Sequence, residues 1–168
     1  MTQKVINRFS VLIVVFIILL SVLVADTSRP PTHSYLHPLP DSVEYRSRSY
    51  KVVSGNLSWY DAAHACTESS YHLVSITDAY HQAFLTILVN RLGVPHWIGL
   101  YTFNLVPADS LTWVDGSPVD YTNWANRGPD TGLLTADSCV TTRGVDGAWH
   151  LSSCTERLGF ICKTVPGE

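Results

Sequence analysis

Four cysteines constrain this chain of 168 residues more than any other feature of its sequence. They are Cys66, Cys139, Cys154 and Cys162. In a chain that enters the secretory route, an even number of cysteines predicts disulfides, and four cysteines allow three pairings. A zinc site would need clustered ligands such as a Cys-x-x-Cys pair, which this sequence lacks. We therefore expect a small domain held together by two disulfides.

The N-terminus is the reason to expect export. Lys4 and Arg8 precede an almost unbroken apolar run, Phe9 to Ala25, which is the pattern of a secretory signal peptide. Residues 1–25 are predicted to be a signal peptide or an uncleaved signal anchor, since about 17 apolar residues can span a membrane. An anchor would make a type II single-pass membrane protein with its ectodomain outside, in contact with the membrane only through residues 9–25. Both interpretations predict a secreted or extracellular domain.

Charge and motif content exclude several classes of function. Eleven Lys and Arg against fourteen Asp and Glu give a net charge of −3, which offers no basic patch for nucleic acid. The sequence contains no Gly-x-Ser-x-Gly, P-loop or Rossmann motif, and paired cysteines leave no thiol for Cys–His catalysis. We therefore predict that the protein is not an enzyme.

Residues 26–44 contain four prolines and are predicted to be a linker or stalk. The domain is predicted to span residues 45–164, followed by a tail of residues 165–168. Its first strand is expected at Tyr45–Val53, where aromatic and β-branched residues alternate with polar ones. Ser58 and Asp78 are predicted N-caps of two amphipathic helices. Short apolar segments separated by turn residues then predict strands and long loops, giving an α+β fold.

Six short motifs follow one another along this predicted domain. They are Trp97-Ile98-Gly99-Leu100, Trp113-Val114-Asp115-Gly116, Asn123-Trp124, Asp137-Ser138-Cys139-Val140, Gly147-Ala148-Trp149 and Gly159-Phe160-Ile161-Cys162-Lys163. In order and spacing they resemble the C-type lectin-like domain family. The resemblance implies two helices, short antiparallel strands, a long loop region, and the disulfides Cys66–Cys162 and Cys139–Cys154. Because residues 26–65 contain no cysteine, the chain resembles the short form of the domain.

The tryptophans of these motifs are expected to play two roles. Trp97, Trp113 and Trp149 are predicted core residues, because each offers a large apolar area. Gly99 is expected to allow a close approach between backbones. Trp124, which a polar loop follows, is a candidate for contact with a ligand.

The resemblance also implies positions for a calcium site. Sugar-binding members use Glu-Pro-Asn or Gln-Pro-Asp, an acidic residue before the next cysteine, and a Trp-Asn-Asp motif. This chain has Gly128-Pro129-Asp130 and Asp137 at the first two, but His150 and Leu151 follow the tryptophan of the third. Only Asp130 and Asp137 remain as candidate metal ligands, whereas Ca²⁺ takes about 6–8 oxygen ligands. We therefore expect no required cofactor, with calcium binding as an alternative.

The sequence thus predicts a non-catalytic extracellular recognition module that binds a protein or glycan through the loop region Val119 to Thr142. Its candidate ligand-contacting residues are Trp124, Asn126, Asp130, Asp137 and His150. A calcium-dependent carbohydrate-binding lectin with a divergent site is one alternative, and a structural domain without its own ligand is another.

Asn56-Leu57-Ser58 is an N-glycosylation sequon placed just before the first predicted helix. In an exported chain Asn56 is therefore a candidate glycosylation site. The alternative is that Ser58 serves only as the helix cap and Asn56 as a turn residue.

Overall fold

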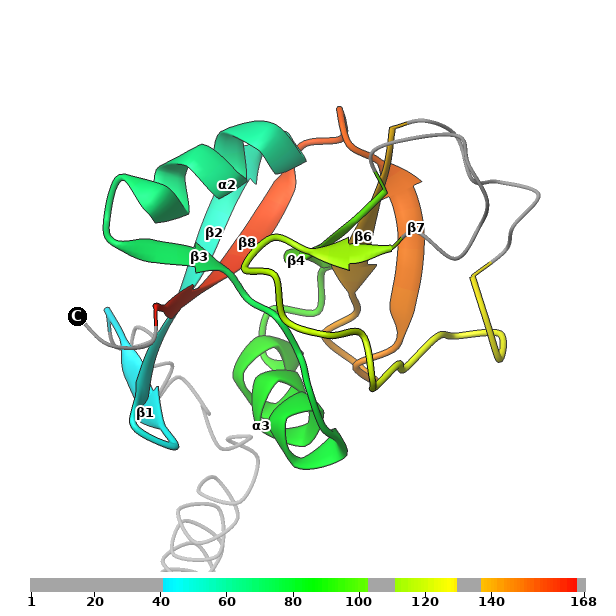
Figure 1. Ribbon diagram of the computed structural model, residues 1–168, viewed down its shortest axis with the longest axis horizontal. Helices are drawn as coiled ribbons and strands as arrows, with labels where there is room; N and C mark the ends of the chain where they lie inside the picture. Colours follow the sequence, from blue (N-terminus) through cyan, green and yellow to red (C-terminus); the bar gives the residue numbers. More distant parts are fainter. Residues whose placement is uncertain (1–40, 103–110, 130–136, 166–168) are drawn as a thin grey trace, which may run out of the picture. The chain divides into compact units, whose positions relative to one another are not determined.

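A computed structural model describes residues 41–102, 111–129 and 137–165 of the chain (Figure 1). The predicted segment 1–25, most of the predicted linker and candidate ligand Asp130 lie outside the described residues. No helix within these ranges is long and apolar enough to cross a membrane.

The described domain begins with a hairpin. Strand β1 (Val43–Tyr45) pairs antiparallel with β2 (Arg48–Leu57), so the single strand predicted at Tyr45–Val53 is wrong. The predicted linker end at residue 44 is likewise two residues too late, because β1 begins at Val43. Arg46 and Ser47 connect the strands with φ angles of 48° and 59°, as in a type I′ turn. The sequence does not indicate this turn, because neither residue is the Asn or Gly that is usual at these positions.

Both predicted helices are present with the predicted caps. Helix α2 (Trp59–Thr67) begins after Ser58, and α3 (Ala79–Asn90) begins after Asp78. Each cap side chain accepts a hydrogen bond from the backbone N–H three residues later, at 3.2 and 2.9 Å. Because these bonds satisfy N–H groups that a helix start leaves unpaired, they fix where each helix begins. The two helices lie on opposite sides of the sheet region (Figure 1).

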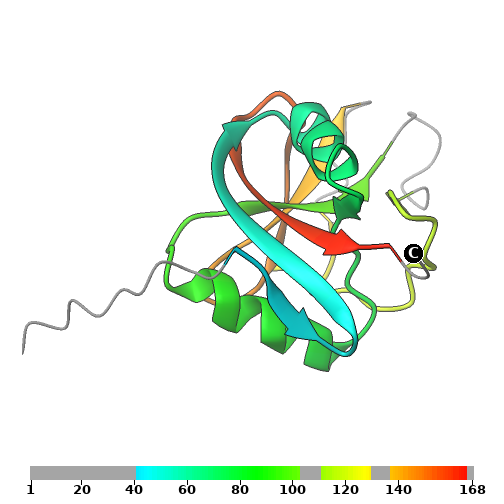
Figure 2. The same cartoon turned by 90° about the vertical axis from the view of Figure 1, so that its left-hand side faces the viewer.

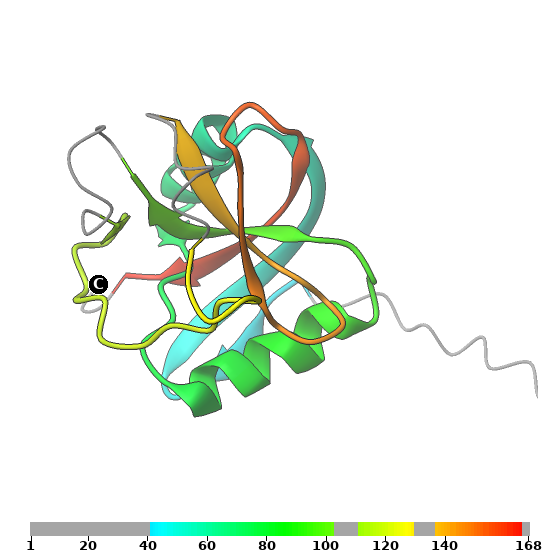
Figure 3. The ribbon, with the colours of Figure 1, turned by 90° about the vertical axis from the view of Figure 1, so that its right-hand side faces the viewer.

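One sheet joins the described strands in the order β1-β2-β8-β4-β6-β7. The strands not yet named are β3 (Tyr71–Leu73), β4 (His96–Tyr101), β5 (Thr112–Trp113), β6 (Ser138–Thr142), β7 (Trp149–Ser153) and β8 (Leu158–Thr164). Strand β3 also pairs with β8, and β5 with β4. Figure 2 shows β2 and β8 side by side, and Figure 3 shows β4, β6 and β7. The described pairs are antiparallel except β4 with β8, which is parallel.

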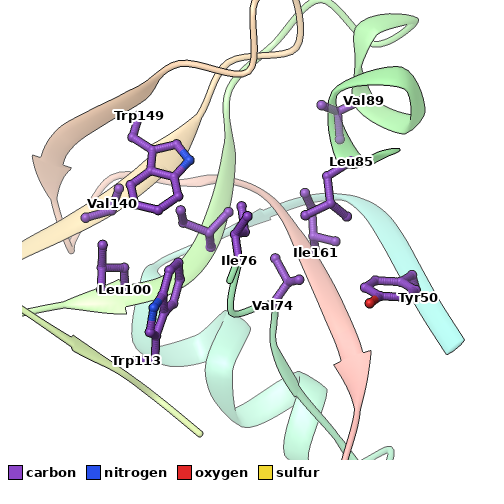
Figure 4. Close-up of a cluster of buried hydrophobic side chains, with 11 residues drawn as sticks. Tyr50, Val74, Ile76, Leu85, Val89, Leu100, Trp113, Val140, Trp149 and Ile161 are labelled. Carbon is purple, nitrogen blue, oxygen red and sulfur yellow. The ribbon is translucent and has the colours of Figure 1, made fainter. Parts of the chain in front are cut away.

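The core confirms the predicted roles of three tryptophans. Trp97, Trp113 and Trp149 are at most 1% exposed, and Figure 4 shows the last two among aliphatic side chains of the sheet. Gly99 also has its predicted role. A Cβ atom on Gly99 would lie 2.7 Å from the carbonyl oxygen of Leu73, so a side chain there would force the two backbones apart.

Both disulfides have the pairing that the resemblance implies. The Cys66–Cys162 bond joins α2 to β8, and the Cys139–Cys154 bond joins β6 to the turn after β7. The first closes a loop of 96 residues and the second a loop of 15. On the chain-entropy estimate these loops stabilise the fold by about 4–5 and about 3 kcal/mol. The longer link therefore ties the helical half of the domain to its last strand.

Candidate functional site

Three of the predicted ligand-contacting residues line one small pocket. Trp124, Asn126 and His150 face a space of about 120 Å³ between residues 124–129 and strand β7. The other lining residues are Ala125, Gly128, Pro129, Trp149 and Leu151. We call this space the indole pocket.

The wall of the indole pocket is held on the edge of β7 by backbone hydrogen bonds. The N–H of Trp149 donates to the carbonyl of Asn123 at 2.8 Å, and the N–H of Ala125 donates back to Trp149 at 3.2 Å. Trp124 thereby forms a parallel bridge with Trp149. The Asn123 side-chain amide donates to the carbonyl of Gly147 at 2.9 Å. This short segment is therefore fixed to the sheet as an added strand would be.

The two tryptophans of the pocket have different surroundings. Trp149 is buried, and its indole N–H donates to the Gln82 side-chain oxygen at 2.7 Å. Trp124 is half-buried and meets the Trp149 ring edge to face, with ring centroids 5.6 Å apart. Its indole N–H has no partner within the described residues. Trp149 therefore forms a fixed floor, whereas Trp124 keeps a free donor.

His150 and Asn126 add further unpaired polar groups. The Nε2 atom of His150 is buried and has no protein partner. Burial lowers the pKa of His150, Arg143 lowers it further, and Asp146 opposes both, so the imidazole is neutral at neutral pH. A neutral imidazole offers one donor and one acceptor. The exposed Asn126 amide makes no hydrogen bond with another described residue.

Asp137, the remaining described candidate, lies outside the indole pocket. It is exposed, and its carboxylate accepts a hydrogen bond from the Tyr60 hydroxyl of α2 at 3.1 Å. It precedes Ser138, which pairs with Ser153, three positions along β7 from His150. The structure therefore brings three of the predicted residues together and leaves Asp137 beside α2.

The described residues do not fit the calcium site that the family resemblance implies. Leu151, which occupies the position of an acidic ligand, presents an apolar side chain to the pocket. No group of three or more His, Cys, Asp or Glu side chains among residues 41–102, 111–129 and 137–165 is placed to hold a metal ion. Asp137 alone offers a carboxylate, and it already accepts from Tyr60. Calcium prefers about 6–8 oxygen ligands, which this set does not supply.

Sequence reasoning missed two contributors to this region. Leu151 appears in the sequence only as a lost ligand, yet it lines the indole pocket. Tyr60 was not singled out, although it bonds to Asp137 across 77 positions of sequence. Alternation along β7 places Leu151 on the same face as buried Trp149, and Leu151 is partly buried against the core.

The chain matches a known domain over most of its length. A family model described as "Lectin C-type domain" matches residues 55–164. The secretory phospholipase A2 receptor of Homo sapiens is 40% identical over 134 residues, which cover 79% of this chain and 9% of the receptor. The chain thus spans less than a tenth of that relative's length.

Solved structures with the same fold include two that are 27% identical to this chain. One is the cow C-type carbohydrate-recognition domain of CD23 in the presence of GlcNAc2Man3 oligosaccharide. It has a TM-score of 0.64, with 77% of this chain and 96% of that chain covered. The other is human lithostathine, with a TM-score of 0.66, 74% of this chain and 97% of that chain covered.

Proposed function

The chain belongs to the C-type lectin domain family, and on that basis we propose that it is a non-catalytic extracellular recognition module. It binds a protein or glycan through the indole pocket and the long loop beside it. The carrying observation is that Trp124, Asn126 and His150 line one pocket, where the buried Nε2 atom of His150 has no hydrogen-bond partner. Unpaired groups on a rigid frame are available to a ligand.

The lining of the indole pocket favours binding over catalysis. Its eight described residues include no Ser, Cys, Lys, Asp or Glu, so the described lining offers no nucleophile beside His150. General acid–base catalysis usually positions its titratable group with a second one. His150 is the single titratable residue of the lining, and we assign it a hydrogen-bonding role.

The size and chemistry of the indole pocket suit a small part of a larger ligand. Its volume of about 120 Å³ is below the range of about 300–1,000 Å³ typical for drug-sized ligands. An aromatic ring, an amide and an imidazole can contact both a sugar hydroxyl and a polar peptide group. One relative is named as a receptor for secretory phospholipase A2, and one solved structure contains an oligosaccharide. These names support both ligand classes.

We propose that this binding does not require calcium, because of the ligand set described above. Binding of the oxidised protein to a glycan array and to immobilised secretory phospholipase A2 should be compared with CaCl₂ and with EDTA. We expect the signal to survive EDTA. Binding that appears only with CaCl₂ would instead support the calcium-dependent lectin, with Asp130 and Asp137 as its ligands.

A pair of variants assigns the binding to the indole pocket. Trp124→Ala should weaken binding by about tenfold or more, since buried aromatic residues dominate many interfaces. Tyr80→Ala is the matched control, because Tyr80 is 75% exposed and is not among the residues that line the indole pocket. Equal effects of the two variants would contradict the proposal, as would an absence of binding to both probes.

We further propose that residues 1–25 direct export, that residues 26–42 form the linker, and that Asn56 carries an N-glycan. Asn56 is exposed, while the Ser58 hydroxyl caps α2, so the two roles of the sequon are compatible. Treatment of the secreted protein with a glycosidase should increase its gel mobility. Asn56→Gln removes the sequon but retains the cap, and it should abolish that increase.

A further inference from the structure

A second pocket lies among the β1–β2 hairpin, the start of α3 and the end of β8. It has a volume of about 270 Å³ and shares no lining residue with the indole pocket. The lining side chains that decide its chemistry are Arg46, Arg48, Tyr50, His81, Asp115 and Lys163. We call it the arginine pocket, and we infer that it binds one oxyanion group, a sulfate or carboxylate of an extracellular glycan.

The arginine pocket contains one positive charge that no carboxylate neutralises. Arg46 donates to Asp78 at 2.7 Å, and the Lys163 ammonium lies 3.3 Å from the Asp115 carboxylate. Arg48 forms no hydrogen bond or ion pair through its side chain with any of the described residues. A guanidinium binds carboxylate, sulfate or phosphate oxygens through paired N–H groups. Arg48 is therefore the anchor for an anion.

The one acidic group in the lining is already occupied. The Asp115 carboxylate accepts hydrogen bonds from the Ser75 hydroxyl at 2.5 Å and from the Ser117 N–H at 3.0 Å. Burial raises the pKa of Asp115, but these hydrogen bonds and the Lys163 ammonium together hold it below its usual value. Asp115 thus stays ionised and neutralises Lys163. A cation entering the pocket would meet Arg48, whereas an anion would not meet a free carboxylate.

Two buried neutral groups complete the pocket. His81 is 5% exposed, and its Nε2 atom is buried without a protein partner. Burial, followed by the Lys163 charge, lowers the pKa of His81 to about 4. Burial also raises the pKa of Tyr50 to about 12. At neutral pH the imidazole and the phenol are therefore uncharged and able to donate a hydrogen bond to an anion.

The hairpin and α3 hold these groups in place. The Arg46–Asp78 ion pair joins the hairpin turn to the α3 N-cap, and the two elements lie beside each other in Figure 2. The Tyr45 ring stacks on Phe84 of α3 with centroids 4.2 Å apart. Packed aromatic rings thus fix Tyr45, one of the residues that line the arginine pocket.

The whole-molecule charge of −3 does not draw anions to the protein. Attraction comes from the pocket itself and is weakened by salt. The proposal that the anion belongs to a glycan depends on the extracellular role proposed above. The proposal that the pocket binds an anion depends only on the residues of the pocket. The experiment must therefore separate the two.

The test is a titration of the oxidised protein at constant ionic strength with three probes. They are sodium sulfate, a sulfated heparin disaccharide and a neutral disaccharide that carries neither sulfate nor carboxylate. Calorimetry should give saturable binding of the first two and none of the third. Arg48→Gln and His81→Phe should each weaken sulfate binding by about tenfold, since hydrogen bonds to charged groups are the stronger ones. Arg48→Lys should retain part of it.

Arg91→Gln is the matched control. It removes the same charge from an exposed arginine at the C-terminal end of α3, outside the arginine pocket. Bound sulfate should also raise the pKa of His81 in the unmodified protein, measured by NMR, which needs no variant to fold. Trp124→Ala should leave sulfate binding unchanged.

Three outcomes would overturn the inference. They are the absence of saturable sulfate binding, equal weakening by Arg91→Gln and Arg48→Gln, and an unchanged pKa of His81. Binding of sulfate without binding of the sulfated disaccharide would overturn the glycan source. Loss of sulfate binding in Trp124→Ala would place the anion in the indole pocket instead.

Discussion

The indole pocket and the arginine pocket use the same sheet in opposite ways. In the indole pocket, uncharged polar groups lie over a buried tryptophan, and the Asn126 amide and the Trp124 indole N–H have no hydrogen-bond partner among the described residues. In the arginine pocket, most charges are already paired: Arg46 with Asp78, and Lys163 with Asp115. The exposed polar groups of the first pocket therefore contribute little to stability, whereas the ion pairs of the second help to hold the domain together.

This difference has a physical origin. Unpaired polar groups near the surface cost little because water can reach them, whereas a buried charge must be matched. Lys163 and Asp115 have side chains that are only 13% and 11% exposed. Evolution can therefore change the indole pocket with few consequences for folding, but a change in the arginine pocket affects both binding and stability.

The largest expected effect is the loss of the Lys163 charge. Lys163→Met should destabilise the protein by about 3 kcal/mol or more, because it leaves the buried Asp115 carboxylate without its ion-pair partner. Chemical denaturation monitored by tryptophan fluorescence would measure this. Burial lowers the pKa of Lys163 below its usual value, and the Asp115 carboxylate opposes this shift.

A double-mutant cycle isolates the interaction between the two groups. Adding Asp115→Asn to Lys163→Met should restore part of the lost stability, since no buried charge then remains unpaired. Additive losses would show that the two side chains do not stabilise each other. Ligand binding at the indole pocket should be unchanged in these variants below the unfolding transition.

The next effect concerns the pH dependence of stability. Burial, followed by the Lys163 charge, lowers the pKa of His81 from its ordinary value of 6.5 to about 4 in the folded protein. Between these values the unfolded chain binds more protons, so the free energy of unfolding falls as the pH drops from 6.5 to 4. This difference in pKa corresponds to a loss of about 3 kcal/mol in the free energy of unfolding once His81 is protonated in both states. Stability measured from pH 7 to pH 4 should show this loss.

Two variants sharpen this comparison. His81→Phe removes the titrating group but keeps a ring between Tyr45 and Tyr50, so its stability should vary less over the same pH range. The charged groups around His81 are Arg46, Asp78 and Lys163, and they remain in both proteins. His150→Phe should change the pH profile in the same direction but less, since His150 is only half-buried. An identical profile for wild type and His81→Phe would contradict the buried, neutral state of His81.

The third prediction compares the stability effects of substituting two core tryptophans that contact each other. The Trp113 and Trp149 rings meet with centroids 5.5 Å apart. Trp149 donates to Gln82, whereas the Trp113 indole nitrogen has no protein partner. Both Trp→Phe variants remove the same atoms, but only Trp149→Phe leaves a buried acceptor unpaired. It should be the more destabilising by about 1–3 kcal/mol, measured by urea denaturation, and equal losses would refute the role of the Gln82 hydrogen bond.

The sequence predicted the indole pocket far better than the arginine pocket. The tryptophans, both helix caps and the disulfides could be predicted, because each of these depends on local spacing or on the family pattern. The residues of the indole pocket come from two short segments, 124–129 and 149–151. A motif can therefore describe them.

The arginine pocket was missed because it is assembled from four segments of the chain. Its residues span positions 45 to 163, and none forms a recognisable motif with the others. The hairpin that presents Arg46 and Arg48 was itself missed, because a type I′ turn without Asn or Gly has no sequence signature. Asp137 shows the opposite case. The family pattern places it with His150 in one predicted ligand set, but the register of β6 and β7 sets the two residues apart along the sheet.

The smallest effect is expected at Asp137, and it tests the boundary of the indole pocket. Asp137→Asn keeps an acceptor for the Tyr60 hydroxyl but removes the charge, so stability should change by less than about 0.5 kcal/mol, as for other exposed sites. Tyr60→Phe, which removes the hydrogen bond but keeps the Asp137 charge, is the matched control. Because Asp137 lies outside the indole pocket, neither variant should alter ligand binding in EDTA. A loss of binding in Asp137→Asn that CaCl₂ modulates would join Asp137 to the binding surface and return calcium to the mechanism.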